Sequence, residues 1–185
     1  MKLGLSFPQT EIGTDPIVIK DFLQAAEELG YDFVTFVDHV LGEEAPRGAT
    51  FANKYTRDYM FHEVMVLMGY AAAVTQKIGL GTAVMILPQR QAVLVAKQAA
   101  EIDILSGGRL RLGVGLGWNK VEYDALGMTF GNRAKRFGEQ IDVMRKLWSN
   151  RTVEYNGEFH KFENAGINPE PVQRPIPVWI GAMKE

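Results

Sequence analysis

The sequence predicts an α/β protein in which a (β/α)8 TIM barrel is truncated after about five βα units. Short, continuously apolar segments alternate with amphipathic segments of helical period, a pattern typical of a parallel sheet covered by helices. The motif G-x-G-x-x-G after the first strand and the Walker A motif are both missing, which disfavours a doubly wound nucleotide-binding sheet. The 185 residues are fewer than the roughly 250 of a typical barrel. We therefore expect residues 1–185 to form one domain, the N-terminal part of a barrel.

The first strand and helix carry clear local signals. Residues 3–7 (LGLSF) predict a short buried strand. Asp15 can cap a helix that begins at Pro16, and apolar residues then recur three and four positions apart. Gly30 can end this helix in a left-handed conformation. Residues 33–37 (FVTFV) predict the second strand.

The same alternation continues along the middle of the chain. An apolar helix is expected over about residues 60–74, a third strand over 77–87 and a third helix over 91–105. Two glycines after Ser106 predict the end of that helix. Residues 109–117 (RLRLGVGLG) predict the fourth strand.

The last third of the chain predicts the fifth unit. Helical patterns cover residues 119–126 and 133–148. Residues 153–162 resemble a small hairpin that turns at Asn156-Gly157. Residues 175–182 (PIPVWIGA) predict the fifth strand.

Composition limits the partners and the compartment. Twenty basic and 22 acidic side chains give a net charge of −2, so no broad basic field predicts binding of nucleic acid or of a membrane surface. The absence of cysteine excludes disulfides and thiolate chemistry and fits a reducing compartment. No signal peptide and no apolar run of about 18 residues is evident. We expect a cytoplasmic protein with a small-molecule substrate and, because the histidines lack metal-ligand spacing, no metal.

Barrel enzymes place their chemistry at the carboxyl ends of the strands. The second strand ends on Asp38 and His39, and the chain has only three histidines. A histidine can give or take a proton near neutral pH, and an aspartate can orient a bound ring. The residues alone leave open that Asp38 caps a turn and that His39 is structural. The same edge should collect further residues from strands three to five, namely Thr82, Ala83, Val84, Gly113, Gly115, Gly117, Trp118 and Gly181.

Several segments together resemble a known family, the bacterial luciferase-like oxidoreductases, and within it the branch that uses the deazaflavin coenzyme F420. The segments are LGLSFPQ, VDHVLG, LGTAVMILPQRQAVLVAKQAAEIDILSGGRLRLGVGLGWN and PVQRPIPVWIGA. The resemblance covers the whole chain. It implies a (β/α)8 barrel of the bacterial luciferase type with an insertion, often dimeric, so we expect a homodimer or other self-association.

The resemblance also implies roles for the strand-end residues. It places Asp38 and His39 beside the reactive ring of the coenzyme, with His39 as proton donor or acceptor. It places a non-prolyl cis peptide at Ala83-Val84, next to Thr82, behind that ring. Gly181 resembles the start of the segment whose amides hold the coenzyme phosphate. The other expected contacts are three glycines that permit close approach and a tryptophan that walls the pocket: Gly113, Gly115, Gly117 and Trp118.

The implied activity is that of an F420-dependent oxidoreductase, which moves hydride between reduced deazaflavin and a small organic substrate. The chain departs from the sugar-phosphate dehydrogenases of this branch, with Trp118 where they carry glutamate and Leu41-Gly42-Glu43 where they carry tryptophan. We therefore expect a largely apolar substrate. Two alternatives stay open: an FMN-dependent luciferase-like monooxygenase, and a non-catalytic scaffold that binds flavin or a partner. Because the later loops of the phosphate site are expected beyond Glu185, residues 1–185 by themselves should bind coenzyme weakly or not at all.

Overall fold

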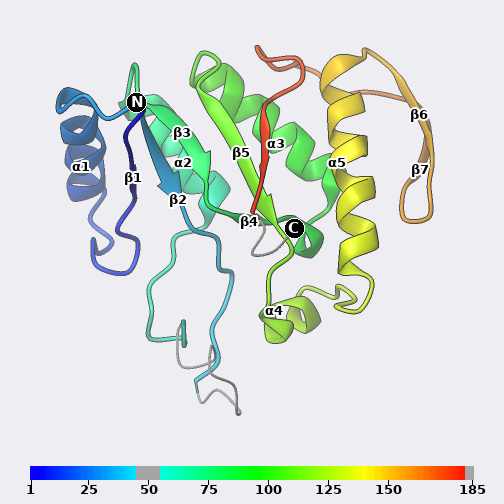
Figure 1. Ribbon diagram of the computed structural model, residues 1–185, viewed down its shortest axis with the longest axis horizontal. Coiled ribbons are helices and arrows are strands. Elements are labelled where there is room, and N and C mark those ends of the chain that lie inside the picture. Colours follow the sequence, from blue (N-terminus) through cyan, green and yellow to red (C-terminus); the bar gives the residue numbers. More distant parts are fainter. Residues whose placement is uncertain (45–54, 182–185) are drawn as a thin grey trace.

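A computed structural model describes residues 1–44 and 55–181 as a parallel sheet with helices packed against it (Figure 1). The strands of the sheet are β1 (Gly4–Ser6), β2 (Phe33–Phe36), β3 (Gly79–Thr82), β4 (Met85–Ile86), β5 (Leu110–Gly115) and β8 (Val178–Ile180). The helices are α1 (Pro16–Glu28), α2 (Val64–Val74), α3 (Ala92–Leu105), α4 (Lys120–Ala125) and α5 (Arg133–Ser149). A 3-10 turn (Leu87–Gln89) follows β4, and β6 (Val153–Asn156) and β7 (Lys161–Ala165) form a separate antiparallel hairpin.

All pairings in the larger sheet are parallel. Strands β1, β2, β3 and β5 lie side by side in that order, and β4 and β8 both pair with β5. The predicted α/β architecture with successive parallel strands is therefore confirmed. Within the two described ranges β1 and β8 are not paired with each other, so the sheet is open there.

The predicted third strand, residues 77–87, is two strands in the structure. β3 pairs with both β2 and β5, whereas β4 pairs only with β5. Ala83 and Val84 lie between them and are joined by a cis peptide bond, at the position implied by the family resemblance. A continuous apolar run in the sequence gives no sign of this interruption.

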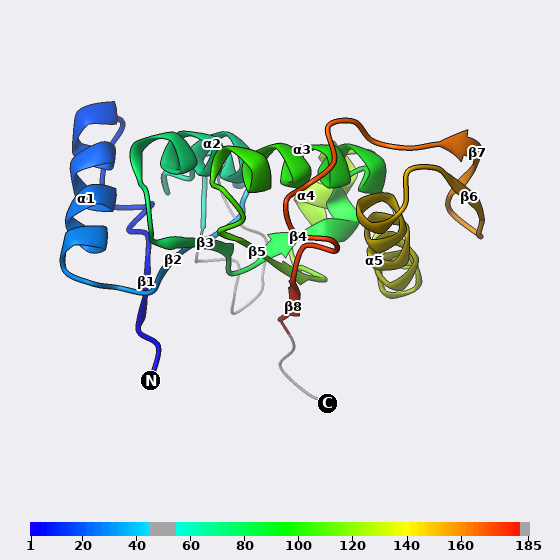
Figure 2. The same cartoon turned by 90° about the horizontal axis from the view of Figure 1, so that it is seen from above.

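Helices α1, α2 and α3 cover one face of the sheet (Figure 2). Asp15 caps α1 as predicted, because its carboxylate accepts the Ile17 N–H at 2.8 Å. Glu63 accepts the Val66 N–H at 2.8 Å and caps α2, so that helix begins at Val64 rather than near residue 60. The layer between sheet and helices is filled by buried apolar side chains, including Leu23, Phe36, Met68, Leu80, Ala96 and Leu112.

Helix α5 packs against α3 and contacts β6 of the hairpin (Figure 1). The predicted hairpin is present, but its turn is longer than the expected two residues because Asn156 pairs with Lys161. Glu139 of α5 explains the longer loop, since its carboxylate accepts the amides of residues 158, 159 and 160. Over the described part of the chain, no helix has the length and apolar character needed to cross a membrane.

Candidate active site

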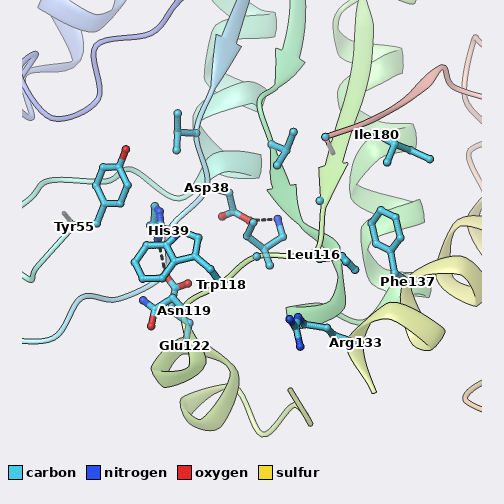
Figure 3. A pocket seen from close by; sticks show the side chains of 16 residues that line it. Asp38, His39, Tyr55, Leu116, Trp118, Asn119, Glu122, Arg133, Phe137 and Ile180 are labelled. Carbon is cyan, nitrogen blue, oxygen red and sulfur yellow. Dashed lines mark hydrogen bonds and ion pairs between the residues drawn. The ribbon is translucent and has the colours of Figure 1, made fainter. Parts of the chain in front are cut away.

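A cavity of about 610 Å³ lies at the carboxyl ends of β2, β4, β5 and β8 (Figure 3). This is the edge at which a barrel enzyme places its site, and the volume is typical of sites for small molecules. Its lining comes from the strand ends, from α4 and α5 and from the loop before α2: Val37, Asp38, His39, Tyr55, Val84, Ile86, Gly115, Leu116, Gly117, Trp118, Asn119, Glu122, Arg133, Phe137, Ile180 and Gly181.

Most residues predicted for the site meet in this cavity: Asp38, His39, Val84, Gly115, Gly117, Trp118 and Gly181. Thr82 of β3 and Gly113 of β5 instead contact each other outside the lining. The Thr82 hydroxyl donates to the Gly113 carbonyl at 2.5 Å, and a Cβ on Gly113 would meet the Thr82 carbonyl oxygen at 1.9 Å. Glycine at position 113 therefore serves strand packing. Ala83 is exposed outside the lining, and ligand contact by these three residues stays a prediction.

A buried carboxylate from α4 holds the imidazole of His39. Its Nδ1 lies 3.1 Å from Oε1 of Glu122, whose side chain is 1% exposed. The same oxygen accepts the Val40 N–H at 2.9 Å, and Gln89 Nε2 donates to the other oxygen at 3.1 Å. Because Nδ1 is engaged, Nε2 is the nitrogen with which His39 can exchange a proton with a bound molecule.

Hydrogen bonds keep Glu122 ionised. Burial alone raises the pKa of this carboxyl, but the bonds from His39, Gln89 and Val40 outweigh burial and lower the pKa below the ordinary value of 4.5. The site therefore holds a buried negative charge in contact with the imidazole.

Asp38 makes a different set of contacts. Arg90 donates to both of its carboxylate oxygens, at 2.7 Å from Nη2 and 3.3 Å from Nε. The Ile86 N–H donates to Asp38 at 3.0 Å, and Arg90 also bonds Glu63 at 3.0 Å. Burial lowers the pKa of Arg90, but the two carboxylates outweigh it and raise that pKa. Asp38 thus ties the end of β2 to β4 and to the start of α3, and its contact with a coenzyme stays a prediction.

Aromatic side chains surround the His39 ring. The distances between ring centroids are 4.7 Å to Tyr55, 4.8 Å to Phe61 and 6.0 Å to Trp118. Trp118 and Tyr55 lie beside His39 in Figure 3. This end of the cavity therefore offers apolar ring faces next to a group that can exchange a proton.

Val84 sits between two glycines in the cavity wall. A Cβ on Gly115 would lie 2.6 Å from one Val84 methyl group, and a Cβ on Gly181 would lie 2.8 Å from the other. Both distances are shorter than carbon atoms tolerate, so glycine at these positions makes room for the valine. Gly117 has a φ of 67°, a left-handed conformation that favours glycine. The result is a smooth apolar surface facing the cavity.

A positive charge lies at the end of the cavity opposite His39 (Figure 3). Arg133, the first residue of α5, lines the cavity beside Phe137. Its guanidinium stacks 3.7 Å from the centroid of the Phe130 ring, and its buried Nε has no hydrogen-bond partner among residues 1–44 and 55–181. A guanidinium suits a phosphate or a carboxylate. The amide of Gly181, by contrast, donates to the Val114 carbonyl at 2.8 Å, so it is not available to an anion.

Residues 5–185 match the luciferase-like monooxygenase family. The chain belongs to this family. The match extends over nearly the whole luciferase-like chain and confirms the family inferred from the strand-end segments.

Curated relatives of the luciferase-like chain are longer than it is. An uncharacterized protein of Mycobacterium tuberculosis, Rv0953c, is 42% identical over 117 residues, which are 63% of this chain and 42% of that protein. Pyrimidine monooxygenase RutA of Allorhizobium ampelinum is 33% identical over an alignment of 199 residues, which covers 98% of this chain and 51% of RutA. The chain thus spans about half the length of the curated relatives it matches.

Solved structures share the fold of the luciferase-like chain. The F420-dependent tetrahydromethanopterin reductase of Methanopyrus kandleri has a TM-score of 0.75 at 23% identity, over 99% of this chain and 50% of that one. The oxygenating constituent of 3,6-diketocamphane monooxygenase of Pseudomonas putida, in complex with FMN, has a TM-score of 0.76 at 17% identity, over 97% and 51%. These similarities show the fold.

Sequence reasoning missed Glu122 and Arg133 of the luciferase-like chain. Glu122 is in the first turn of α4, just after the N-cap Asn119. An acidic side chain a few positions after the fourth strand in the sequence was the signal that could have identified it. Arg133 begins α5, but basic residues are common on exposed helices. Only the packing of the helices against the strand ends distinguishes these two side chains from their charged neighbours.

Proposed function

We propose that a protein containing this chain is an F420-dependent oxidoreductase, which moves hydride between reduced deazaflavin and a small, largely apolar organic substrate. The observation that carries the proposal is the position of His39. Its imidazole is bonded to a buried carboxylate and lines a cavity that also holds an apolar wall at Val84 and a cation at Arg133.

The residues of the cavity fit a deazaflavin cofactor. Val84, seated between Gly115 and Gly181, offers an apolar surface without projecting polar groups to a flat ring. Arg133 brings a guanidinium to the cavity lining, and a guanidinium suits the phosphate of such a cofactor. The cavity volume of about 610 Å³ suits a ring system with a substrate beside it.

Coenzyme F420, when bound, gives or takes hydride at C5 of its deazaflavin ring. The chain supplies the proton chemistry and the orientation. His39 Nε2 takes or gives the proton that accompanies hydride transfer. Tyr55 and Trp118, which line the cavity, bind the apolar part of the substrate, and Phe61 packs on the His39 ring and reduces the access of water to it.

The second candidate is an FMN-dependent monooxygenase of the same fold. The observation in its favour is the 33% identity to a pyrimidine monooxygenase along 98% of the chain. A deazaflavin lacks the nitrogen at which flavins activate oxygen, so the consumption of oxygen distinguishes the two reactions.

Turnover under argon tests the proposed function. Coenzyme F420 is mixed with the protein and with small secondary alcohols or, when reduced, with small ketones, and its absorbance is followed. We expect turnover with at least one pair and a loss of about 10²- to 10⁴-fold in His39→Gln. His160→Gln is the matched control, since His160 lies in the hairpin loop outside the cavity lining. In a parallel assay in air with reduced FMN, oxygen-dependent turnover would favour the monooxygenase if coenzyme F420 supports none under argon. Binding without turnover in either assay would favour a scaffold.

A further inference from the structure

We infer that Glu122 positions His39, because its carboxylate keeps the proton of the neutral imidazole on Nδ1 and so presents Nε2 to the cavity as a proton acceptor. The catalytic consequence rests on the proposed function, whereas the location of the proton does not. Glu122 acts through His39 and is a positioning residue.

Two carboxylates adjoin His39, and only one of them is bonded to the imidazole. Asp38, its neighbour in sequence, is occupied by Arg90 and by the Ile86 amide. Glu122 is 83 positions away in sequence, yet its Oε1 lies 3.1 Å from Nδ1. The partner of the histidine therefore comes from α4 and not from the end of β2.

The direction of this hydrogen bond follows from the ionised state of Glu122. Its Oε1 accepts the Val40 amide at 2.9 Å and lies 3.4 Å from the Leu41 nitrogen. Its Oε2 accepts from Gln89 at 3.1 Å. These donors stabilise the charged form, and a charged carboxylate has no proton to donate. His39 is thus the donor, and the neutral ring carries its proton on Nδ1.

The carboxylate and the ring are both restrained. Gln89 is 3% exposed and holds Oε2 from the 3-10 turn after β4. Tyr55 and Phe61 pack on the imidazole with centroid distances of 4.7 and 4.8 Å. A histidine held in this way keeps one tautomer and one ring plane, so its other nitrogen keeps a fixed direction.

Nitrogen-15 NMR of the ring nitrogens measures the tautomer without any variant at position 122. The His39 signals are assigned by their loss in His39→Gln. We expect the neutral ring to carry its proton on Nδ1. A neutral ring protonated mainly on Nε2 would overturn the inference.

Carboxylate-to-amide variants identify which group sets the tautomer. Glu122→Gln keeps the shape of the side chain and is expected to shift the His39 population toward Nε2–H. Asp38→Asn should leave the tautomer as it is. Glu139→Gln is the matched control, because Glu139 lies 2.7 Å from Nδ1 of His160; it should alter the His160 signals only. A shift of His39 in Asp38→Asn but not in Glu122→Gln would contradict the assignment.

Kinetics connect the tautomer to turnover. In Glu122→Gln we expect kcat to fall about 10- to 100-fold with little change in KM, because the partner of the histidine is removed and the substrate contacts remain. A shifted tautomer with unchanged kcat would overturn the catalytic part of the inference. Full activity of His39→Gln would instead refute the proposed function and leave the NMR result standing.

Discussion

Single residues give the cavity opposite charges at its two ends. Glu122 places a buried negative charge beside His39, and Arg133 places a positive charge beside Phe137 (Figure 3). Val84 adds an apolar side chain to the same lining. This arrangement suits a long ligand that reacts at a flat ring and carries a negative group at its far end.

The charge at Arg133 can be tested with two flavins that differ in their phosphate. Arg133→Met should weaken the binding of FMN about 10- to 100-fold, because a charge-assisted hydrogen bond contributes about 1.5–3 kcal/mol. Binding of riboflavin, which has no phosphate, should change little. The measurement is a fluorescence titration of both ligands.

Arg145→Met is the control for this titration, since Arg145 is exposed on the same helix. It should bind both flavins as the parent protein does. An equal loss for FMN and riboflavin in Arg133→Met would show that the arginine shapes the cavity rather than binding an anion.

At the residue scale the sequence predicted the location of the site better than the hydrogen bonds and ion pairs within it. Asp38 and His39 were found because a strand end followed by two ionisable residues is a local pattern. Their partners, Arg90 and Glu122, lie 52 and 83 positions away. Such pairs depend on how helices pack against the sheet, which no local pattern records.

Among the elements, the interruption between β3 and β4 shapes the cavity. Val84 lies in this interruption and fills space that side chains at positions 115 and 181 would need. The two glycines come from the ends of β5 and β8, so three strands combine to form one apolar surface.

Gly115→Ala should disturb this surface. The new Cβ would lie 2.6 Å from a Val84 methyl group, so we expect a loss of about 1–3 kcal/mol in the free energy of unfolding and weaker cofactor binding. Gly138→Ala is the control, and we expect it to raise the free energy of unfolding rather than lower it. Gly138 is inside α5 with open space around it, so alanine should stabilise the protein by about 0.5–1 kcal/mol. Urea unfolding measures both, and a neutral Gly115→Ala would contradict the packing described.

The elements themselves were largely predictable. Periodicity and caps located α1, α3 and α5 to within a few residues, because each helix buries one side against the sheet or against a neighbouring helix. The start of α2 was placed too early, since the cap at Glu63 is an acidic side chain among other polar residues. The hairpin turn was placed too tightly because Glu139, on a different element, determines the loop.

Across the whole molecule, three glutamates on helices accept hydrogen bonds from backbone amides of segments distant in sequence. Glu27 of α1 accepts the amides of residues 76–78, Glu122 of α4 accepts those of residues 40 and 41, and Glu139 of α5 accepts those of residues 158–160. Burial raises the pKa of each carboxyl, but the hydrogen bonds outweigh it and lower all three pKa values below 4.5.

These pKa shifts predict sensitivity to acid. A carboxyl whose folded pKa lies below its unfolded pKa stabilises the fold fully above the unfolded value, near 4.5, and this stability is lost as the pH falls through the folded pKa. The free energy of unfolding should therefore decrease as the pH is lowered below about 4.5. Glu27→Gln should cost about 1–3 kcal/mol at neutral pH and reduce the slope in acid.

Glu28→Gln is the matched control, because Glu28 is the exposed neighbour of Glu27 on α1. The free energy of unfolding of Glu28→Gln should equal that of the parent protein at every pH. Identical acid profiles for Glu27→Gln and the parent protein would show that the amide contacts of Glu27 contribute no stability dependent on pH.

The most direct measurement is an equilibrium titration, followed by fluorescence, of a protein that contains this chain within a complete barrel, with coenzyme F420 and with FMN. We expect saturable binding of coenzyme F420 that is weakened by Arg133→Met and by Gly115→Ala. A clear preference for FMN would move the protein to the monooxygenase alternative. Binding of neither cofactor would contradict the central claim that this cavity holds a flavin-type cofactor beside His39.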